Sequence, residues 1–518
     1  MASAELDNSP STFDPSEQSA VALGVLSAGA VLGALADLLL RSSPLGANTP
    51  LWTAALVAAI VWLAHRQRRS LTSIQVVLLA VALFFAAGFA WRASRVLNLL
   101  DAAAVAVALS LAAGHISTTR KALRRASLME YARTGASAGA STAIGTISLI
   151  AEDIRWRQLP RATWGTRSRS VAVGVLIAAP LLLGFNALFM SADMVYEETV
   201  KGLFRVDFEA PFRHLLFILV GTWCAAGFLR ALAPLPAVLP WLKVGPRGVT
   251  IGLGAIEVGI PLVLLDMLFA CFIGFQLPYL FGGHGLVQDP GGPTYAEYAR
   301  RGFFELVVVA ALTLPLLLAA DWLLRDRTWK ERALFRLLAA IMVVLLLILL
   351  MSAFHRMILY LHSYGLTELR FYTTAFMIWL ALLTLWFAMT ALTGRRDRFA
   401  FGALVAGFVA IALLHVVNPD ACIARTDLAR AQIGNGPDME YLTSLSADAI
   451  PTLVPVLFAS TGDPSGRIRH TAALFLARRE QLTQPDWRTW NWGRTKAKEA
   501  LDRAWDNLPD ASRTSLSC

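Results

Sequence analysis

Long, uninterrupted apolar stretches recur along this chain and predict its architecture. A helix needs about 20 apolar residues to cross a bilayer, and in hydrocarbon only helices and closed barrels satisfy every backbone polar group. The apolar residues are continuous rather than alternating, which favours helices. We therefore predict an all-α fold, a polytopic bundle of about 11 transmembrane helices. The predicted spans are Ala20–Leu40, Leu51–Ala64, Ile74–Ala90, Val96–Ala113, Val171–Met190, Leu215–Ala233, Thr250–Leu280, Phe303–Leu324, Leu337–Tyr360, Thr373–Leu392 and Phe399–Val417.

One of these stretches, Thr250–Leu280, is longer than a bilayer requires. At a rise of about 1.5 Å per residue it would reach roughly 46 Å. We expect it to tilt, to break near Pro261 or to protrude from the membrane.

The pattern changes after Val417, where no stretch is long and apolar enough to span a bilayer. Helical periodicity recurs there in Ala421–Gln432, Ala447–Phe458, Arg467–Gln481 and Trp487–Asn507. The predicted division is an acidic cytoplasmic N-terminus (1–19), a four-helix membrane part (20–113), a basic cytoplasmic insertion (114–170), a seven-helix membrane core (171–417) and a small extracytoplasmic helical tail domain (418–518).

Charge gives the expected orientation. The chain is only 16% charged and has a net charge of +10, which in a soluble protein would suggest nucleic acid. Here Lys and Arg collect on loops that the predicted spans place on one face, which is the positive-inside pattern. It predicts a multi-pass inner (cytoplasmic) membrane protein with its N-terminus in the cytoplasm. We expect the lipid bilayer as a partner and no nucleic acid. Arg92 and Arg95 fall on the opposite face and weaken the pattern.

The basic insertion contains two stretches of unusual composition. TTRKALRRASLMEYARTG would place its basic residues on one side of a helix lying on an anionic leaflet, although orientation by loop charge is the simpler interpretation. The following GASAGASTAIGTISLI is rich in small residues, as in a close-packing or re-entrant element.

Carboxylates inside apolar stretches are the first candidates for function, because a charge at membrane depth is costly. Glu257 and Asp266 are nine residues apart in one predicted span. They therefore lie about 180° apart on a regular helix and share no cavity unless Pro261 breaks it. Each is a candidate proton or cation site, with a helix-packing ion pair as the alternative.

Two further groups have helical spacing. Glu297, Arg301 and Glu305 would form a chain of ion pairs entering the membrane, or a solvated helix start. Arg356 and Arg370, with Tyr360 and Tyr364, would either hold an anionic group or anchor helices at the interface. All of these, with Glu257 and Asp266, make up the candidate polar membrane site.

Enzyme signatures are absent from the sequence. It contains no HExxH, GxSxG, P-loop or strand-linked GxGxxG motif, and its four cysteines show no paired spacing. We predict no catalytic residues, no metal and no cofactor.

Four segments together resemble a known family: EYARRGFFEL (297–306), RMILYLHSYGLTELRFY (356–372), NPDACIAR (418–425) and YLTSLSADAIP (441–451). They are similar to a bacterial family of polytopic membrane proteins classed as a domain of unknown function. The resemblance runs from about Val171 to the end and leaves the first 170 residues outside. It implies a membrane protein with a helical tail and supplies no catalytic residues.

Three classes of function follow. The first is transport or handling of an ion, a lipid or a small solute through the buried charges. The second is signalling or scaffolding by a membrane protein whose outer domain binds an extracytoplasmic or membrane protein partner. The third is an unrecognised intramembrane enzyme.

Overall fold

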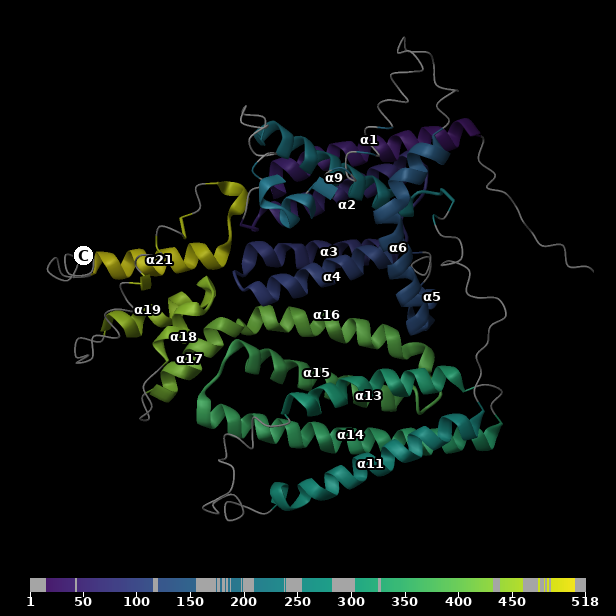
Figure 1. The fold of residues 1–518 in the computed structure, drawn as a ribbon, viewed down its shortest axis with the longest axis vertical. Helices are drawn as coiled ribbons and strands as arrows, with labels where there is room; N and C mark the ends of the chain where they lie inside the picture. The colour runs from purple at the N-terminus through teal and green to yellow at the C-terminus, as the bar shows by residue number, and fades with distance from the viewer. Residues whose placement is uncertain are drawn as a thin grey trace, which may run out of the picture.

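The computed structural model in Figure 1 describes most of the chain. The described residues are 15–41, 44–114, 120–154, 209–236, 254–281, 303–324, 328–431, 438–459 and 486–507, with isolated positions between 174 and 198, at 238 and between 474 and 483. The regular elements in these ranges are helices.

Among the described residues, ten helices are long and apolar enough to cross a membrane. They lie side by side in Figure 1 and form a polytopic helical bundle, as the apolar pattern predicts. The ten are α1 (Pro15–Leu40), α2 (Asn48–Arg66), α3 (Ser73–Trp91), α4 (Arg95–Ala113), α9 (Glu209–Leu232), α11 (Ala255–Phe281), α13 (Phe303–Leu323), α14 (Trp329–Tyr364), α15 (Glu368–Thr390) and α16 (Phe399–Val417).

The predicted span Val171–Met190 lies outside the described residues except at isolated positions. The described segments on either side of it end at residue 154 and begin at residue 209. Near the start of α1, Gln18 donates to Asp153 at 3.2 Å, and Asp153 accepts from Arg230 near the end of α9 at 2.7 Å. Residue 154 therefore lies at the end of the bundle where α1 begins.

The start of α9 lies at the other end. Its His214 contacts Asp37, close to the end of α1, at 2.6 Å. The described residues 154 and 209 therefore lie at opposite ends of the bundle.

The bundle has two apolar cores. In the first, α11, α13 and α15 pack around the long helix α14, with Leu317, Met342 and Leu346 fully buried. The helix α11 continues through Pro261 and runs obliquely to α14 in Figure 1. The helix is therefore not broken at Pro261, and its tilt in the membrane or protrusion from it stays a prediction.

The second core joins α1, α2, α3, α4 and α9. The helix α16 lies between the two cores, because Ala403 and Ala406 contact the first while Phe401 and Leu404 contact the second. Its fully buried residues are confined to its two ends: Phe399 and Ala400 at the start, and His415 near the finish.

Helices that are not among the ten spans cover the end of the bundle where α1 begins. The helix α5 (Arg120–Arg125) precedes α6 (Leu128–Ser148), which Ser127 and Glu130 cap reciprocally, and a π-helical turn η2 (Leu149–Asp153) follows. In Figure 1, α5 and α6 run across the ends of the spans. The small-residue stretch in α6 packs closely on α9, since a Cβ on Gly145 would lie 3.1 Å from the carbonyl oxygen of Gly227.

The C-terminal helices gather at the opposite end (Figure 1). They are α17 (Pro419–Ala431), α18 (Met439–Ser444), α19 (Ile450–Ala459) and α21 (Trp492–Asp506), with short 3-10 turns η6 (Ala447–Ala449) and η7 (Trp487–Thr489). The predicted helices Ala421–Gln432, Ala447–Phe458 and Trp487–Asn507 are found with shifted ends, and the short helix α18 was not predicted. Most of the fourth predicted helix, Arg467–Gln481, lies outside the described residues. Their own apolar core, which includes Ile423, Leu453 and Leu501, packs against Leu366 and Phe371 of the bundle.

The contact between α1 and α9 depends on glycine. A Cβ on Gly33 would lie 2.5 Å from the backbone nitrogen of Thr222, and one on Gly29 would lie 2.6 Å from the Cβ of Ala226. Small residues that let helix backbones approach are typical of membrane helix interfaces, where apolar burial supplies little driving force.

We predict that Gly33→Ala lowers the stability of the bundle by about 1–3 kcal/mol, the usual cost of overpacking. Denaturant unfolding in a mild detergent measures the change. Gly407→Ala in α16 is the matched control, because nothing lies within 4 Å of a Cβ at that position. Equal stability of the two variants would contradict the close packing.

Candidate functional site

A buried histidine and aspartate meet near the end of the bundle that carries the C-terminal helices. His415 of α16 and Asp101 of α4 are 2% and 0% exposed. The His415 Nε2 atom lies 3.1 Å from Asp101 Oδ2, and the His415 Nδ1 atom lies 3.1 Å from the carbonyl oxygen of Ile411. The indole of Trp91 packs against the imidazole with ring centroids 5.6 Å apart.

This geometry requires a proton between the two side chains. A carbonyl oxygen only accepts hydrogen bonds, so Nδ1 of His415 carries a hydrogen. The contact between Nε2 and the carboxyl oxygen of Asp101 then needs one more proton, held either by the carboxyl group or by a doubly protonated imidazole. Asp101 Oδ1 has no hydrogen-bond partner among the described residues. The pair is thus a proton-binding unit in an apolar setting.

Gly88 of α3 makes room for the pair. A Cβ at this position would lie 2.2 Å from Asp101 Oδ2 and 2.7 Å from His415 Nε2. Even an alanine at position 88 would displace one of the two side chains, so the contact between α4 and α16 depends on a glycine in a third helix.

Arg92 connects the pair to the C-terminal helices. Its guanidinium donates to the carbonyl oxygen of His415 at 3.0 Å from Nε and 2.5 Å from Nη2. Its Nη1 lies 3.9 Å from Asp448 Oδ1, while the other oxygen of Asp448 accepts from the backbone N–H of Ala93 at 2.6 Å. The turn between α3 and α4 is thereby joined to η6.

Around Arg92 and Asp448 lies a group of polar residues that we call the junction cluster. Its members come from the turn between α3 and α4, from the starts of α15 and α17, and from η6 with the residue before it: Arg92, Ser94, Glu368, Tyr372, Asp420, Ser446 and Asp448. Ser446 donates to Asp420 and its hydroxyl accepts from the backbone N–H of Asp448 at 3.3 Å. The hydroxyls of Ser94 and Tyr372 lie 3.3 Å apart.

The junction cluster concentrates acidic groups. Asp420 and Asp448 are 0% and 5% exposed, and burial raises the pKa of both carboxyl groups above the ordinary value. Ser446 and Ala93 act against that shift by donating hydrogen bonds to them. Glu368 lies close to Asp420, and two neighbouring carboxyl groups favour a state in which one of them holds a proton.

Asp266 lies in the other half of the bundle. It belongs to the stripe of α11 that packs on α14, with Leu262 and Phe269 as its neighbours on that face. It is 7% exposed, and neither carboxyl oxygen has a hydrogen-bond partner among the described residues. An isolated buried carboxylate is strongly unfavourable, so such a group tends to be neutral.

Other candidate residues lie at both ends of the bundle. Glu257 is exposed in the first turn of α11 and accepts from the backbone N–H of Gly254 at 2.8 Å. Glu305 is exposed in the first turn of α13, and Glu297 and Arg301 lie outside the described residues. Glu257 and Asp266 stay on separate parts of an unbroken helix.

Arg370, Tyr360 and Tyr364 are brought together at the turn between α14 and α15. The guanidinium of Arg370 stacks 4.1 Å from the Tyr360 ring and donates to the carbonyl oxygens of Tyr364 and Gly365 at 3.0 and 2.6 Å. These contacts close the C-terminus of α14. Arg356 is half-buried on α14.

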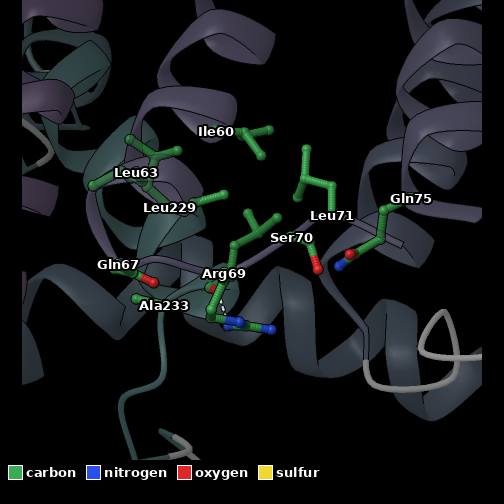
Figure 2. A pocket seen from close by; sticks show the side chains of 11 residues that line it. Ile60, Leu63, Gln67, Arg69, Ser70, Leu71, Gln75, Leu229 and Ala233 are labelled. Atoms are coloured by element: carbon green, nitrogen blue, oxygen red, sulfur yellow. Dashed lines mark hydrogen bonds between the residues drawn. The ribbon is translucent and has the colours of Figure 1, made fainter. Parts of the chain in front are cut away.

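Cavities among the described residues are small. The larger, about 20 Å³, lies between the ends of α2, α3 and α9 and is lined by Leu63, Arg69, Gln75 and Leu229 among others. Figure 2 shows these side chains, with Arg69 reaching back to the carbonyl oxygen of Leu232. A second cavity of about 10 Å³ lies between α11 and α14. Each has room for about one water molecule.

The sequence carries one signal for the pair, which is the presence of ionisable residues within apolar spans. Asp101 and His415 are ionisable residues inside predicted spans, which by itself marks candidates for function. Arg92 appeared only as an exception to the orientation pattern, and the structure accounts for it through its contacts with His415 and Asp448. Nothing in the sequence shows that Gly88 faces the pair.

The fold is that of a multi-pass helical membrane protein. The chain belongs to the family described as Domain of unknown function (DUF4153), whose match covers residues 79–456. The match starts well before Val171, so the expectation that the first 170 residues lie outside the family is wrong. Three of the four segments that carried the resemblance, 356–372, 418–425 and 441–451, meet in the junction cluster. No curated protein and no solved structure matches the chain.

The raised pKa values of Asp420 and Asp448 predict how pH affects the attachment of the C-terminal helices. The folded protein holds these protons more tightly than an unfolded chain, whose carboxyl pKa is about 4. The protons on Asp420 and Asp448 therefore stabilise the folded attachment fully below that value. This stabilisation is lost as the pH rises through the pKa of these groups in the folded protein. Amide hydrogen exchange of α17–α21, corrected for its intrinsic pH dependence, should show several-fold more opening at high pH.

Asp420→Asn should flatten this pH dependence, because the amide keeps an acceptor for Ser446 but does not titrate. Glu440→Gln is the control, since Glu440 is exposed on α18. Unchanged pH dependence in Asp420→Asn would show that Asp420 does not determine it.

Proposed function

We propose that this protein handles protons, which it binds at the buried pair Asp101 and His415. The observation that carries the proposal is the contact itself, in which both imidazole nitrogens face oxygen atoms and one proton must lie between the side chains. Ionisable groups inside membrane spans are rare and commonly belong to proton or ion pathways.

The proton is favoured over a larger substrate on grounds of size. Two cavities among the described residues, of about 20 and 10 Å³, admit about one water molecule each, so neither has room for a lipid or an organic solute in this conformation. The described residues also contain no group of three His, Cys, Asp or Glu side chains placed to hold a metal ion. A proton needs neither a cavity nor a cage of ligands.

Polar groups extend from the pair toward the end of the bundle that carries the C-terminal helices. Arg92 donates to the backbone carbonyl oxygen of His415 and lies near Asp448. An arginine stays protonated, so Arg92 would stabilise negative charge on Asp448 rather than pass on the proton itself. Asp266 is a second proton-binding candidate, buried in the half of the bundle formed by α11 and α14.

The orientation of the protein follows from its basic residues. Arg66 and Arg69 after α2, Arg124 and Arg125 in α5, and Lys330 at the start of α14 lie at the end of the bundle opposite the C-terminal helices. The positive-inside rule then puts the N-terminus in the cytoplasm. The C-terminal helices would form an extracytoplasmic domain from residue 418 onward, and the membrane would be a bacterial inner membrane.

Proteoliposomes with a trapped pH-sensitive dye test the proposal. An imposed potential should drive proton uptake by the wild-type protein, and Asp101→Asn, His415→Gln and Gly88→Ala should each lower the rate at least tenfold. Gly88→Ala is informative because it leaves both ionisable residues present but has no space for their contact. Asp266→Asn reports separately on the second carboxyl group.

Glu440→Gln, which alters an exposed acid of α18, should keep the wild-type rate. Equal rates in the wild type, Asp101→Asn and protein-free vesicles would refute proton transport.

One observation favours signalling as the second candidate. Polar contacts connect the pair to the C-terminal helices, but the buried residues further along α4 are apolar: Ala104, Ala108, Leu111 and Ala112. A proton would then bind from one side and change how the C-terminal helices attach, without crossing the membrane.

Signalling predicts a pH-dependent distance between the bundle and the C-terminal helices. Spin labels at Val405 of α16 and Glu499 of α21, both exposed, would measure it by double electron–electron resonance. We expect the distance distribution to broaden or shift between pH 5 and pH 8 in the wild type and to stay constant in Asp101→Asn. Proton uptake without any change in distance would favour transport instead.

A further inference from the structure

Three tryptophans are exposed where the C-terminal helices meet the bundle. Trp487 lies in η7, Trp490 follows it and Trp492 begins α21, and their residues are 65%, 41% and 45% exposed. We call 486–494 the tryptophan segment. The indoles of Trp490 and Trp492 pack edge to face at 6.4 Å, and none of the three indole N–H groups donates to a described residue.

The tryptophan segment is held at the level where the spans end. The backbone N–H of Ala47, just before α2, donates to the carbonyl oxygen of Trp490 at 2.8 Å. Asn491 donates to the carbonyl oxygens of Phe89 and Arg92 at 2.8 and 2.9 Å, at the end of α3. Both contacts involve backbone atoms of span ends, so the height of the segment is fixed by the bundle.

Further contacts bind the segment to the turn between α1 and α2. Arg494 donates to the carbonyl oxygen of Leu45 at 2.7 Å, and Arg488 donates to that of Leu38. Gly46 permits the approach, because a Cβ there would lie 2.4 Å from the carbonyl oxygen of Thr489. The segment therefore cannot lift away from the plane of the span ends without breaking several hydrogen bonds.

The chemistry of the segment fits the boundary between lipid and water. Tryptophan has a large apolar ring with one polar N–H, and it is enriched at the headgroup level of membranes. Arg488 is paired with Asp486, and Lys496 is paired with Glu499 at 2.9 Å while it stacks 4.7 Å from the Trp492 ring. Arg488 and Lys496 thus have acidic partners and Arg494 is bound to backbone carbonyl oxygens, so the exposed surface of the segment is dominated by indole rings.

We propose that Trp487, Trp490 and Trp492 insert into the headgroup region of the adjacent lipid leaflet and hold the C-terminal helices against the membrane. The occupant of this surface is the phospholipid leaflet, because the segment is continuous with the ends of α1, α2 and α3. Trp91 at the end of α3 is also exposed and belongs to the same level. This inference does not depend on the proposed handling of protons.

Spin-label depth measurements test the inference on the full-length protein in nanodiscs of phosphatidylethanolamine and phosphatidylglycerol at a ratio of about 3:1. In a chain with its four cysteines replaced, single labels are placed by Trp487→Cys and Trp492→Cys. Glu440→Cys on α18 supplies the water reference and Val409→Cys in the middle of α16 the hydrocarbon reference, both at exposed positions. Collision with oxygen and with a water-soluble nickel complex gives the depth.

For labels at 487 and 492, the ratio of the oxygen collision rate to the nickel collision rate should be several-fold higher than for the label at 440. It should be lower than for the label at 409. A ratio equal to that at 440 would place the segment in water and overturn the inference. Protection from both reagents would mean that protein, such as a second copy of this chain, covers the surface, and would also overturn it. Two separate labels guard against a local effect of either substitution.

Discussion

The contact between His415 and Asp101 is the constraint on which this part of the molecule depends. Both side chains are buried in an apolar bundle, where a single unpaired charge costs several kcal/mol. Each side chain is acceptable there only because the other supplies a proton or a countercharge. Three helices must therefore keep a fixed register: α4 and α16, which carry the pair, and α3, whose Gly88 leaves the space for it.

The same contact determines where α16 lies. This helix touches both apolar cores, yet His415 is its one fully buried residue beyond the first turn. Apolar packing alone holds the end of α16 weakly, because lipid chains solvate its aliphatic residues as well as its neighbours do. A polar contact has no such substitute in lipid. His415 accordingly orients the end of α16, and Arg92 transmits that position to Asp448 and the C-terminal helices.

Sequence and structure agree best where one physical effect dominates. Burial of apolar residues in lipid decides the spans, so the ten described spans match predicted ones and the C-terminal helices follow from periodicity. The candidate site depends on which faces meet. Glu257 and Asp266 attracted attention as acids in an apolar stretch, but the structure puts Glu257 at an exposed helix start and Asp266 against α14. Arg370, considered for an anionic ligand, is used to close the end of α14.

The sequence by itself determined that this is a multi-pass helical membrane protein, because the length and continuity of its apolar stretches have no other stable form in a bilayer. Only the tertiary structure decided which ionisable residues meet: Asp101 and His415 are 314 positions apart, and no local pattern links them. Their pairing arises from helix packing, in which the absence of a side chain at Gly88 matters as much as the two residues that touch.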